Sequence, residues 1–145
     1  MAIAIQEAKQ AAETGEVPVG AVVVSDGEII ARAHNEMVRR SDPTAHAEIV
    51  ALRRAGARLG TAQLTGCDLY VTLEPCAMCA GAIALARIRR LYFGASDEKG
   101  GAVEHGPRLY GQPTIHHRPE VLGGFCEAEC ADLLRAFFAA RRGNG

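Results

Sequence analysis

Residues 67–86 have the sequence CDLYVTLEPCAMCAGAIALA, in which a strand pattern runs directly into a helix pattern. The β-branched and aromatic residues of 67–73 favour a strand. Pro75 suits the first turn of a helix, where its missing N–H is not needed, and the small apolar residues after it predict a helix over 76–86. A buried strand is expected next, at residues 91–94. Helices that alternate with strands in this way indicate a layered α/β domain.

The rest of the chain continues this alternation in both directions. The Asp26-Gly27 pair between two apolar runs is a strong signal for a two-residue hairpin, so the sheet is expected to be mixed rather than purely parallel. The Gly- and Pro-containing loop over 96–113 is longer than loops usually are without a function. The further predicted elements are a helix over 2–14 that Gly15 ends, strands over 19–24, 28–32 and 120–122, a helix over 46–55 with Asp42 or Thr44 as its cap and Gly56 at its end, and a last helix over 127–142.

The composition is that of an ordinary globular domain. The 145 residues suit one domain spanning 1–145, because a domain takes about 150 residues. Hydrophobic residues make up 48% of the chain and charged residues 23%, which argues against disorder, collagen and coiled coil. The formal net charge of −1 gives no overall attraction to nucleic acid or to a membrane surface.

The sequence gives no sign of export or of membrane insertion. No stretch approaches the ~20 apolar residues that cross a bilayer, and the first residues lack the basic and apolar regions of a signal peptide. We therefore expect a cytoplasmic protein that does not bind membranes. In that reducing compartment the five cysteines are not expected to form structural disulfides, and closely spaced cysteines more often bind metal or take part in chemistry.

Three residues have side chains that zinc prefers: His46, Cys76 and Cys79. Residues three apart lie on one face of a helix, so the Cys-x-x-Cys pair brings both sulfurs together in the first turn. The positive end of the helix dipole lowers the pKa of thiols there and favours the thiolate that a metal needs. His46 also lies near a helix start. One histidine and two cysteines leave one position of a tetrahedral zinc open, as catalytic zinc sites do.

Glu48, two residues after His46, distinguishes a reactive centre from a structural metal site. Its side chain diverges from that of His46 around the helix, so the two are not expected to chelate one ion together. Zinc lowers the pKa of its bound water to about 7, so zinc-bound hydroxide is the expected nucleophile and Glu48 the expected proton shuttle. His-x-Glu with Pro-Cys-x-x-Cys, here residues 46–48 and 75–79, is the described signature of zinc-dependent nucleobase deaminases.

Simpler interpretations of the same residues stay open. A closed structural zinc site would recruit a fourth ligand, for which Cys126 or Cys130 is available. The pair Cys76 and Cys79 alone is also compatible with a redox pair or with two buried thiols. Cys67 has strand spacing and is expected in the core. Four other histidines are expected to be solvated loop residues rather than ligands: His34, His105, His116 and His117.

Several blocks of sequence give the chain a nearly full-length resemblance to a known family. It resembles the cytidine/deoxycytidylate deaminase superfamily and, within it, the bacterial tRNA-specific adenosine deaminases. The block LEPCAMCAGA (73–82) is specific to that branch, whereas His-x-Glu with Pro-Cys-x-x-Cys marks only the superfamily. The other matching blocks are EVPVGAV (16–22), DPTAHAEI (42–49) and FGA (93–95) with Asp97 and Lys99, and weaker support comes from His117-Arg118 and Phe137-Phe138.

The resemblance implies a three-layer α/β/α fold of the cytidine-deaminase type, with a mixed five-stranded sheet between helices. It implies one Zn²⁺ per chain, held by His46, Cys76 and Cys79, and a homodimer that binds RNA near the subunit boundary. The implied reaction is hydrolytic deamination of the wobble adenosine in the anticodon of an arginine tRNA. Its products are inosine and ammonia.

The resemblance also implies roles for individual residues. Glu48 would shuttle protons, Asn35 would hydrogen-bond the base, and the Ala47 backbone would contact the reactive edge of the base. The segment Gly100–Arg108 of the substrate-side loop and His34 before Asn35 depart from the family pattern, which affects RNA docking but not the zinc chemistry. Contacts with the anticodon loop are implied for Asp97, Lys99, Phe138 and Arg142.

Two other functions are compatible with the same motifs. A deaminase of a free base or nucleoside, such as guanine, cytosine or cytidine, would share the fold, the metal and the catalytic core. A protein of another class, a non-catalytic zinc-stabilised RNA-binding scaffold, would keep the metal without turnover. The substrate that is turned over and the effect of replacing Glu48 distinguish these three hypotheses.

Overall fold

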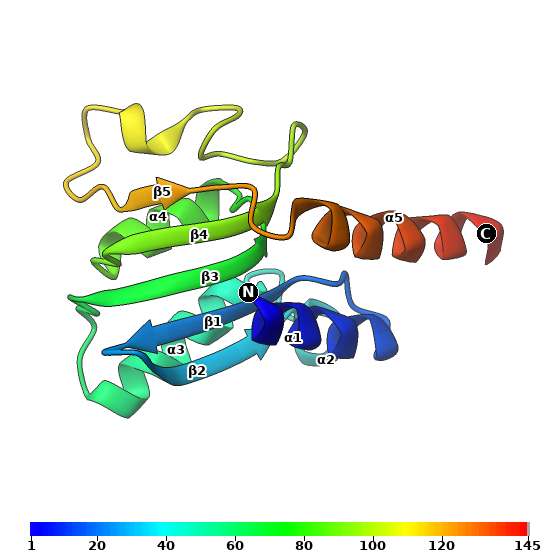
Figure 1. Cartoon of the computed structure of the whole chain (residues 1–145), viewed down its shortest axis with the longest axis horizontal. Coiled ribbons are helices and arrows are strands. Elements are labelled where there is room, and N and C mark those ends of the chain that lie inside the picture. Colours follow the sequence, from blue (N-terminus) through cyan, green and yellow to red (C-terminus); the bar gives the residue numbers. More distant parts are fainter. Residues whose placement is uncertain (145) are drawn as a thin grey trace.

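The computed structural model describes residues 1–144 (Figure 1). Among these residues, no helix combines the length and the apolarity needed to span a membrane. The strands are β1 (Gly20–Ser25), β2 (Glu28–His34), β3 (Cys67–Leu73), β4 (Arg90–Ala95) and β5 (Glu120–Leu122). The helices are α1 (Ala2–Glu13), α2 (Met37–Arg40), α3 (Ala47–Leu59), α4 (Ala77–Leu85), the short 3-10 helix η1 (Leu109–Gly111) and α5 (Glu127–Asn144).

The strands form one mixed sheet in the order β2-β1-β3-β4-β5. β1 pairs antiparallel with both β2 and β3, whereas β3 is parallel to β4 and β4 is parallel to β5. The hairpin between β1 and β2 turns at Asp26 and Gly27, whose φ angles of 50° and 76° are both positive, as the favoured two-residue hairpin turn requires. The mixed sheet predicted from the sequence is therefore confirmed.

Helices cover both faces of the sheet (Figure 1). α3 and α4 lie on one face, and α1 and α5 lie on the other, where α5 projects beyond the edge of the sheet. The larger cluster of buried apolar side chains includes Val71, Ile83 and Phe93, and a smaller cluster contains Ile5, Cys130 and Ala95. This three-layer α/β/α arrangement confirms the predicted fold class.

The strand directions bring several chain segments to one edge of the sheet. β1 begins where β3 ends, because the two strands are antiparallel, and the Gly20 N–H donates to Thr72 Oγ1 at 3.1 Å. β2 ends at the same edge, since His34 pairs with Gly20. The parallel neighbour β4 also ends there, with Ala95 beside Leu73. The segments that lead into α3 and α4 therefore start from one place.

α3 has different ends from those predicted. It continues beyond Gly56 for another turn and ends before Gly60, which has the left-handed φ of 69° and donates its N–H to the Gly56 oxygen at 2.8 Å. Asp42 or Thr44 was expected to cap its start, but neither residue does so. His46 occupies the capping position without a side-chain bond, while Asp42 Oδ1 accepts the N–H and the hydroxyl of Thr44 in a tight turn.

α2 lies in a polar segment for which the sequence analysis predicted no helix. Its Val38 and Arg39 N–H groups donate to the carboxylate of Glu16, at 3.0 and 2.8 Å, and so replace the usual local helix cap. Glu16 is buried between α1 and β1 and is 22 residues away from Val38 along the chain. A helix that depends on so distant a cap carries no local start signal, which is why it was missed.

Gly20 gives the first test, because the backbone of α1 packs directly against the backbone of β1 at this residue. A Cβ on Gly20 would lie 1.9 Å from the backbone oxygen of Ala4 and 2.7 Å from the backbone nitrogen of Ala8. We predict that Gly20→Ala lowers the free energy of unfolding by about 1–3 kcal/mol or more, since α1 must move outward. The measurement is equilibrium unfolding in urea.

The matched control is Gly111→Ala, where an added Cβ has no atom within 4 Å. This change should alter stability by less than about 0.5 kcal/mol. Equal stability of the Gly20→Ala protein and the wild type would contradict the close packing of α1.

Candidate metal centre

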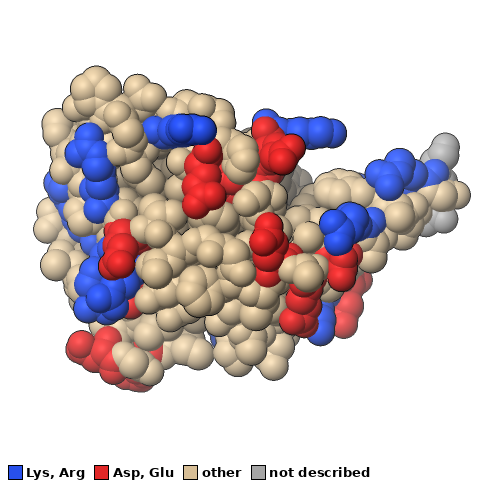
Figure 2. All heavy atoms as spheres, turned by 45° about the horizontal axis from the view of Figure 1, so that its top comes forward, with Lys and Arg blue, Asp and Glu red and all other residues tan. Residues whose placement is uncertain are grey.

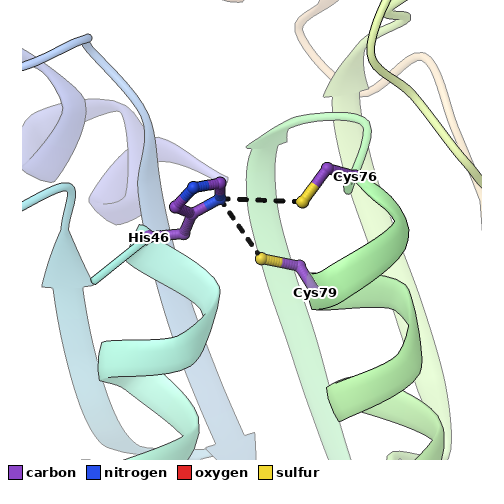
Figure 3. A group of neighbouring side chains, drawn as sticks. All are labelled: His46, Cys76 and Cys79. Atoms are coloured by element: carbon purple, nitrogen blue, oxygen red, sulfur yellow. Dashed lines mark hydrogen bonds between the residues drawn. The ribbon is translucent and has the colours of Figure 1, made fainter. Parts of the chain in front are cut away.

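His46, Cys76 and Cys79 meet where α3 and α4 begin (Figure 3). His46 is the residue before α3 and Cys76 the residue before α4, and both have extended backbone, so each side chain leaves the chain at a helix N-terminus. Cys79 lies in the first turn of α4. The group therefore lies at the positive ends of two helix dipoles, which favour ionised sulfur.

The three side chains have the spacing of tetrahedral metal ligands. His46 Nδ1 lies 3.5 Å from Cys79 Sγ and 3.7 Å from Cys76 Sγ, and the candidate ligand atoms all lie within 4.8 Å of one another. Zinc–sulfur bonds of ~2.3 Å and zinc–nitrogen bonds of ~2.0–2.1 Å at tetrahedral angles would separate sulfur and nitrogen by about 3.6 Å. The residues therefore fit a zinc-sized ion as they stand.

The two sulfurs differ in pKa because they are hydrogen-bonded to each other. Hydrogen bonds from Cys79 and from His46 lower the pKa of Cys76 to about 4. The bond to Cys76, together with burial, raises the pKa of Cys79, and the same thiolate raises the pKa of His46. The low pKa of Cys76 favours its thiolate, the form in which sulfur binds a metal ion.

Neither cysteine considered as a fourth ligand belongs to this group. Cys130 lies on α5 and packs against Gly94, where an added Cβ would be 2.5 Å from Cys130 Sγ. Cys126 precedes α5 and is exposed. Across residues 1–144 the candidate ligand group consists of His46, Cys76 and Cys79. The geometry is that of an open three-ligand site rather than a closed structural one.

Glu48 lies in the first turn of α3 with its side chain buried, and it is not part of the ligand group. Burial raises the pKa of its carboxyl to about 7, and the nearby Cys76 thiolate contributes in the same direction. Glu48 lines a cavity of about 220 Å³ together with His46, Cys76, Asn35 and Asp97. A carboxyl with a pKa near neutrality can both accept and donate a proton there.

Asn35 joins three segments at the wall of this cavity. Its Oδ1 accepts the Ala47 N–H at 2.8 Å, and its Nδ2 donates to the Val17 oxygen at 3.1 Å. Ala47 is the first residue of α3, so this bond fixes the start of the helix that carries Glu48. Of the two residues predicted to hold the base, the structure therefore places Asn35 at the cavity, and it places Ala47 behind Asn35, with its N–H bonded to it.

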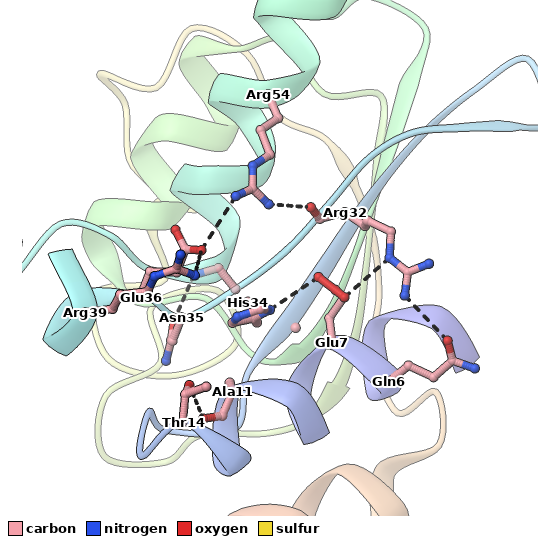
Figure 4. A network of polar contacts seen from close by, with 12 residues as sticks. Gln6, Glu7, Ala11, Thr14, Arg32, His34, Asn35, Glu36, Arg39 and Arg54 are labelled. Atoms are coloured by element: carbon pink, nitrogen blue, oxygen red, sulfur yellow. Dashed lines mark hydrogen bonds and ion pairs between the residues drawn. The ribbon is translucent and has the colours of Figure 1, made fainter.

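A network of acids and arginines lies around Asn35 (Figure 4). Glu7 of α1 accepts from Arg32 Nε at 3.3 Å and contacts His34 Nδ1 at 3.3 Å. Glu36, also buried, pairs with Arg54 at 3.6 Å and with Arg39 and Arg40. The expectation that His34 is a solvated loop residue is wrong, because it ends β2 and its ring is only 16% exposed.

Two further histidines have partners that their sequence context did not indicate. His105 Nδ1 lies 2.7 Å from Glu74 Oε1, and His117 Nε2 lies 2.7 Å from the Ile88 oxygen. Both lie in loops and outside the ligand group, as predicted, but they are only partly exposed, because each has a partner far away in the sequence. His116 is exposed and Cys67 is buried, as predicted.

The residues implied for RNA contact are divided between two places. Asp97, Lys99 and Phe138 line a groove of about 600 Å³ between the 96–100 loop and α5, and this groove adjoins the cavity of Glu48 because Asp97 lines both. The Phe138 side chain is exposed there. Arg142 lies one turn further along α5, outside the residues that line the groove.

Comparison with known proteins decides the family. Residues 1–140 match the family described as MafB19-like deaminase. The chain is 56% identical over 142 residues to a tRNA-specific adenosine deaminase of Agrobacterium fabrum, which covers 98% of this chain and 93% of that protein. This chain belongs to the tRNA-specific adenosine deaminases. The family predicted from the sequence motifs is thereby confirmed, and with it the interpretation of the chain as a hydrolytic deaminase.

Solved structures of deaminases agree with this family assignment. A structure from a study of A-to-I editing by tRNA:A34 deaminases at the wobble position matches with a TM-score of 0.92 and 57% identity, over 92% of this chain and 97% of the other. A guanine deaminase from Nitrosomonas europaea matches with a TM-score of 0.76 and 27% identity, over 95% of this chain and 82% of the other. Deaminases named for different substrates therefore share this fold.

Asn35→Ala tests the bond that fixes the start of α3. The change leaves the buried Ala47 N–H without a partner, whereas the Val17 oxygen keeps the Val19 N–H at 2.8 Å. An unsatisfied buried group costs about 1–3 kcal/mol. We predict a loss of unfolding free energy of that size, measured by chemical denaturation. Gln10→Ala, on the exposed side of α1, is the control and should be nearly neutral. If Asn35→Ala unfolded at the wild-type denaturant concentration, the bond would not be what holds α3.

Proposed function

We propose that this deaminase converts the wobble adenosine in the anticodon of an arginine tRNA to inosine and ammonia, with one zinc ion per chain. One observation carries the proposal: the buried carboxyl of Glu48 shares a cavity with an open three-ligand group. The near-full-length relatives named for tRNA support that substrate over a free base.

His46, Cys76 and Cys79 would hold the zinc ion, which when bound activates a water molecule for attack on the base. The donor set suits this metal, because two sulfurs and an imidazole nitrogen are ligands that zinc accepts in tetrahedral geometry. The lowered pKa of Cys76 favours the thiolate that binds a metal ion.

Glu48 moves both protons of that water. Its carboxylate takes the first proton as the water oxygen bonds to C6 of adenine, and it delivers this proton to N1. The second proton passes through Glu48 from the new hydroxyl to the amino group, the C6–N bond breaks, and ammonia leaves. Burial raises the pKa of Glu48 to about 7, which suits a group that must accept and donate in turn.

Asn35 and the Ala47 backbone are proposed to hold the base. Asn35 lines the cavity beside Glu48, and its bond to the Ala47 N–H holds its side chain in place. A single base must leave its stack to enter such a cavity, which favours a loop over a duplex as substrate. An anticodon loop meets this requirement.

The groove beside the cavity is the proposed path of the RNA. Asp97, Lys99 and Phe138 line it, and the exposed ring of Phe138 can stack on a base. Arg142 is one of the basic residues in the last turn of α5, which projects from the body of the molecule (Figures 1 and 2). Basic side chains on a projecting helix suit the phosphates of a bound RNA.

A homodimer is proposed through the surface of α4. Leu85 of α4 is 81% exposed and Met78 is 38% exposed. Leu85 also lines a shallow hollow with Ile49 and Leu52 of α3. An exposed apolar patch of this kind is typical of a protein–protein interface.

We assign the enzyme to the cytoplasm, where its tRNA substrate is modified, with no membrane partner.

Cys79→Ser tests the metal site. We predict that the purified wild-type protein holds about one zinc per chain and that the variant holds far less, because a serine hydroxyl is a poor substitute for thiolate. Since metal binding is coupled to folding, the variant should also unfold at lower denaturant. Elemental analysis measures the zinc. Cys126→Ser, which changes an exposed cysteine outside the group, is the control and should keep it. Equal zinc in both variants would contradict the assignment.

Glu48→Gln tests the reaction. The variant is expected to keep its zinc and fold but to lose deamination by about 10²–10⁴-fold, because an amide cannot shuttle a proton. Wild type and variant are incubated with an anticodon stem-loop that carries the wobble adenosine, and inosine is read by sequencing and ammonia by a coupled assay. Unchanged turnover by the variant would contradict the role of Glu48.

The same assay separates the three hypotheses. Free adenosine, guanine, cytosine and cytidine are tested beside the RNA. Inosine at the wobble position supports the proposal, whereas turnover of free compounds alone would replace it with a free-base or nucleoside deaminase. Zinc and RNA binding without any turnover would leave the scaffold as the function.

A further inference from the structure

Glu74 is a buried carboxylate that the proposed reaction does not use. It directly follows β3, two residues before Cys76, and its side chain is 0% exposed. A buried charge must be compensated by hydrogen bonds or by opposite charge. Oε1 of Glu74 accepts the Asp97 N–H at 3.0 Å and contacts His105 Nδ1 at 2.7 Å. Oε2 accepts the N–H groups of three consecutive residues, at 3.2, 2.9 and 3.2 Å: Val103, Glu104 and His105.

These bonds outweigh the cost of burying the charge. Four backbone N–H groups donate to the carboxylate, and the His105 ring contacts it as well. Its partners all belong to the segment 97–105.

The segment 97–105 takes its shape from this carboxylate. It contains neither helix nor strand. A Cβ on Gly101 would lie 2.5 Å from Glu74 Oε2 and 2.4 Å from the Asp97 oxygen, so the chain passes too close to the carboxylate for any other residue. The Ala102 N–H donates to the Pro75 oxygen at 2.9 Å, which ties the segment to the same turn of the chain.

The same segment forms one wall of the candidate substrate site. Asp97 and Gly100 line the cavity of Glu48, and residues 96–100 line the adjoining groove. Glu74 itself touches the cavity wall. The position of this wall sets the space beside the target base, where neighbouring nucleotides must fit.

We propose that Glu74 is a positioning residue that sets substrate recognition by holding the 97–105 segment against the end of β3. The proposal rests on the proposed function, because it concerns the binding of an RNA loop by the same site. Glu74 acts through the segment on substrate affinity and leaves proton transfer and metal binding to other residues. The competing explanation is that Glu74 supports the start of α4 and hence the metal ligands.

The test compares Glu74→Gln with Glu104→Gln. The first change keeps the size of the side chain but replaces one accepting oxygen with an NH₂ group and removes the charge. The second makes the same chemical change on an exposed side chain of the same segment, whose N–H is retained. His105→Ala and His105→Asn are made as well, because they remove and partly restore a donor to Glu74 without altering β3.

Two measurements are made on each protein. Hydrogen exchange of the amides of 103–105 in the free protein reports the anchoring and does not depend on any substrate. We expect at least about tenfold faster exchange in Glu74→Gln and no change in Glu104→Gln. Steady-state deamination of the anticodon stem-loop should show KM raised about tenfold in Glu74→Gln, equivalent to ~1.4 kcal/mol, with kcat changed by less than about threefold and zinc content unchanged.

His105→Ala should raise KM in the same direction by about two- to fivefold, and His105→Asn should restore part of the loss. Reduced zinc or a fall in kcat at constant KM in Glu74→Gln would overturn the proposal in favour of support for α4. Unchanged exchange and unchanged KM would also overturn it. If Glu74→Gln does not fold, His105→Ala decides, and an unchanged KM in that variant overturns the proposal.

The wild-type protein separates this outcome from a failure of the proposed function. If the wild type does not deaminate the stem-loop, the proposed function fails. In that case, faster amide exchange in Glu74→Gln would still show that Glu74 anchors the segment. If the wild type deaminates the stem-loop normally and Glu74→Gln has the same KM, only the role of Glu74 is overturned.

Discussion

The pairing of β3 with an antiparallel neighbour on one side and a parallel neighbour on the other is the constraint on which the site depends. It brings the start of β1 and the ends of β2, β3 and β4 to one edge of the sheet. α3 and α4 begin close to that edge, so His46 and the Cys76–Cys79 pair face one another at 3.5–3.7 Å. Since the strands carry the helix starts, any slip in this pairing would separate ligands that lie 30 residues apart in the chain.

Helix ends then supply the electrostatics of the site. Two positive dipole ends and shared hydrogen bonds favour an ionised sulfur, while burial favours the protonated form of Glu48. The same small region thus holds one group that is charged and one that is poised to change its charge. That difference in environment, rather than a difference in residue type alone, distinguishes the sulfurs proposed to bind a cation from the carboxyl proposed to transfer protons.

Buried carboxylates hold the irregular segments around the site in place. Glu16 binds the first N–H groups of α2, and Glu74 binds those of the 97–105 segment. Each is buried and satisfies backbone donors that no helix or sheet partner reaches. Both lie in sequence blocks dominated by apolar residues, EVPVGAV and VTLEPC, where a lone carboxylate has no local purpose. That contrast is the one sequence signal that could have identified them.

Local patterns were enough to predict the helices and strands with strong periodicity, the mixed sheet with its hairpin, and the three side chains of the candidate ligand group. Proline, glycine and Cys-x-x-Cys act within one turn of chain, so their consequences are local. The existence of α2 and the partners of His34 and His105 became clear only from the folded chain. In each of these cases the partner is brought close by the sheet rather than by neighbouring sequence. A hydrogen bond between residues 22 to 31 positions apart leaves no periodic trace in the chain.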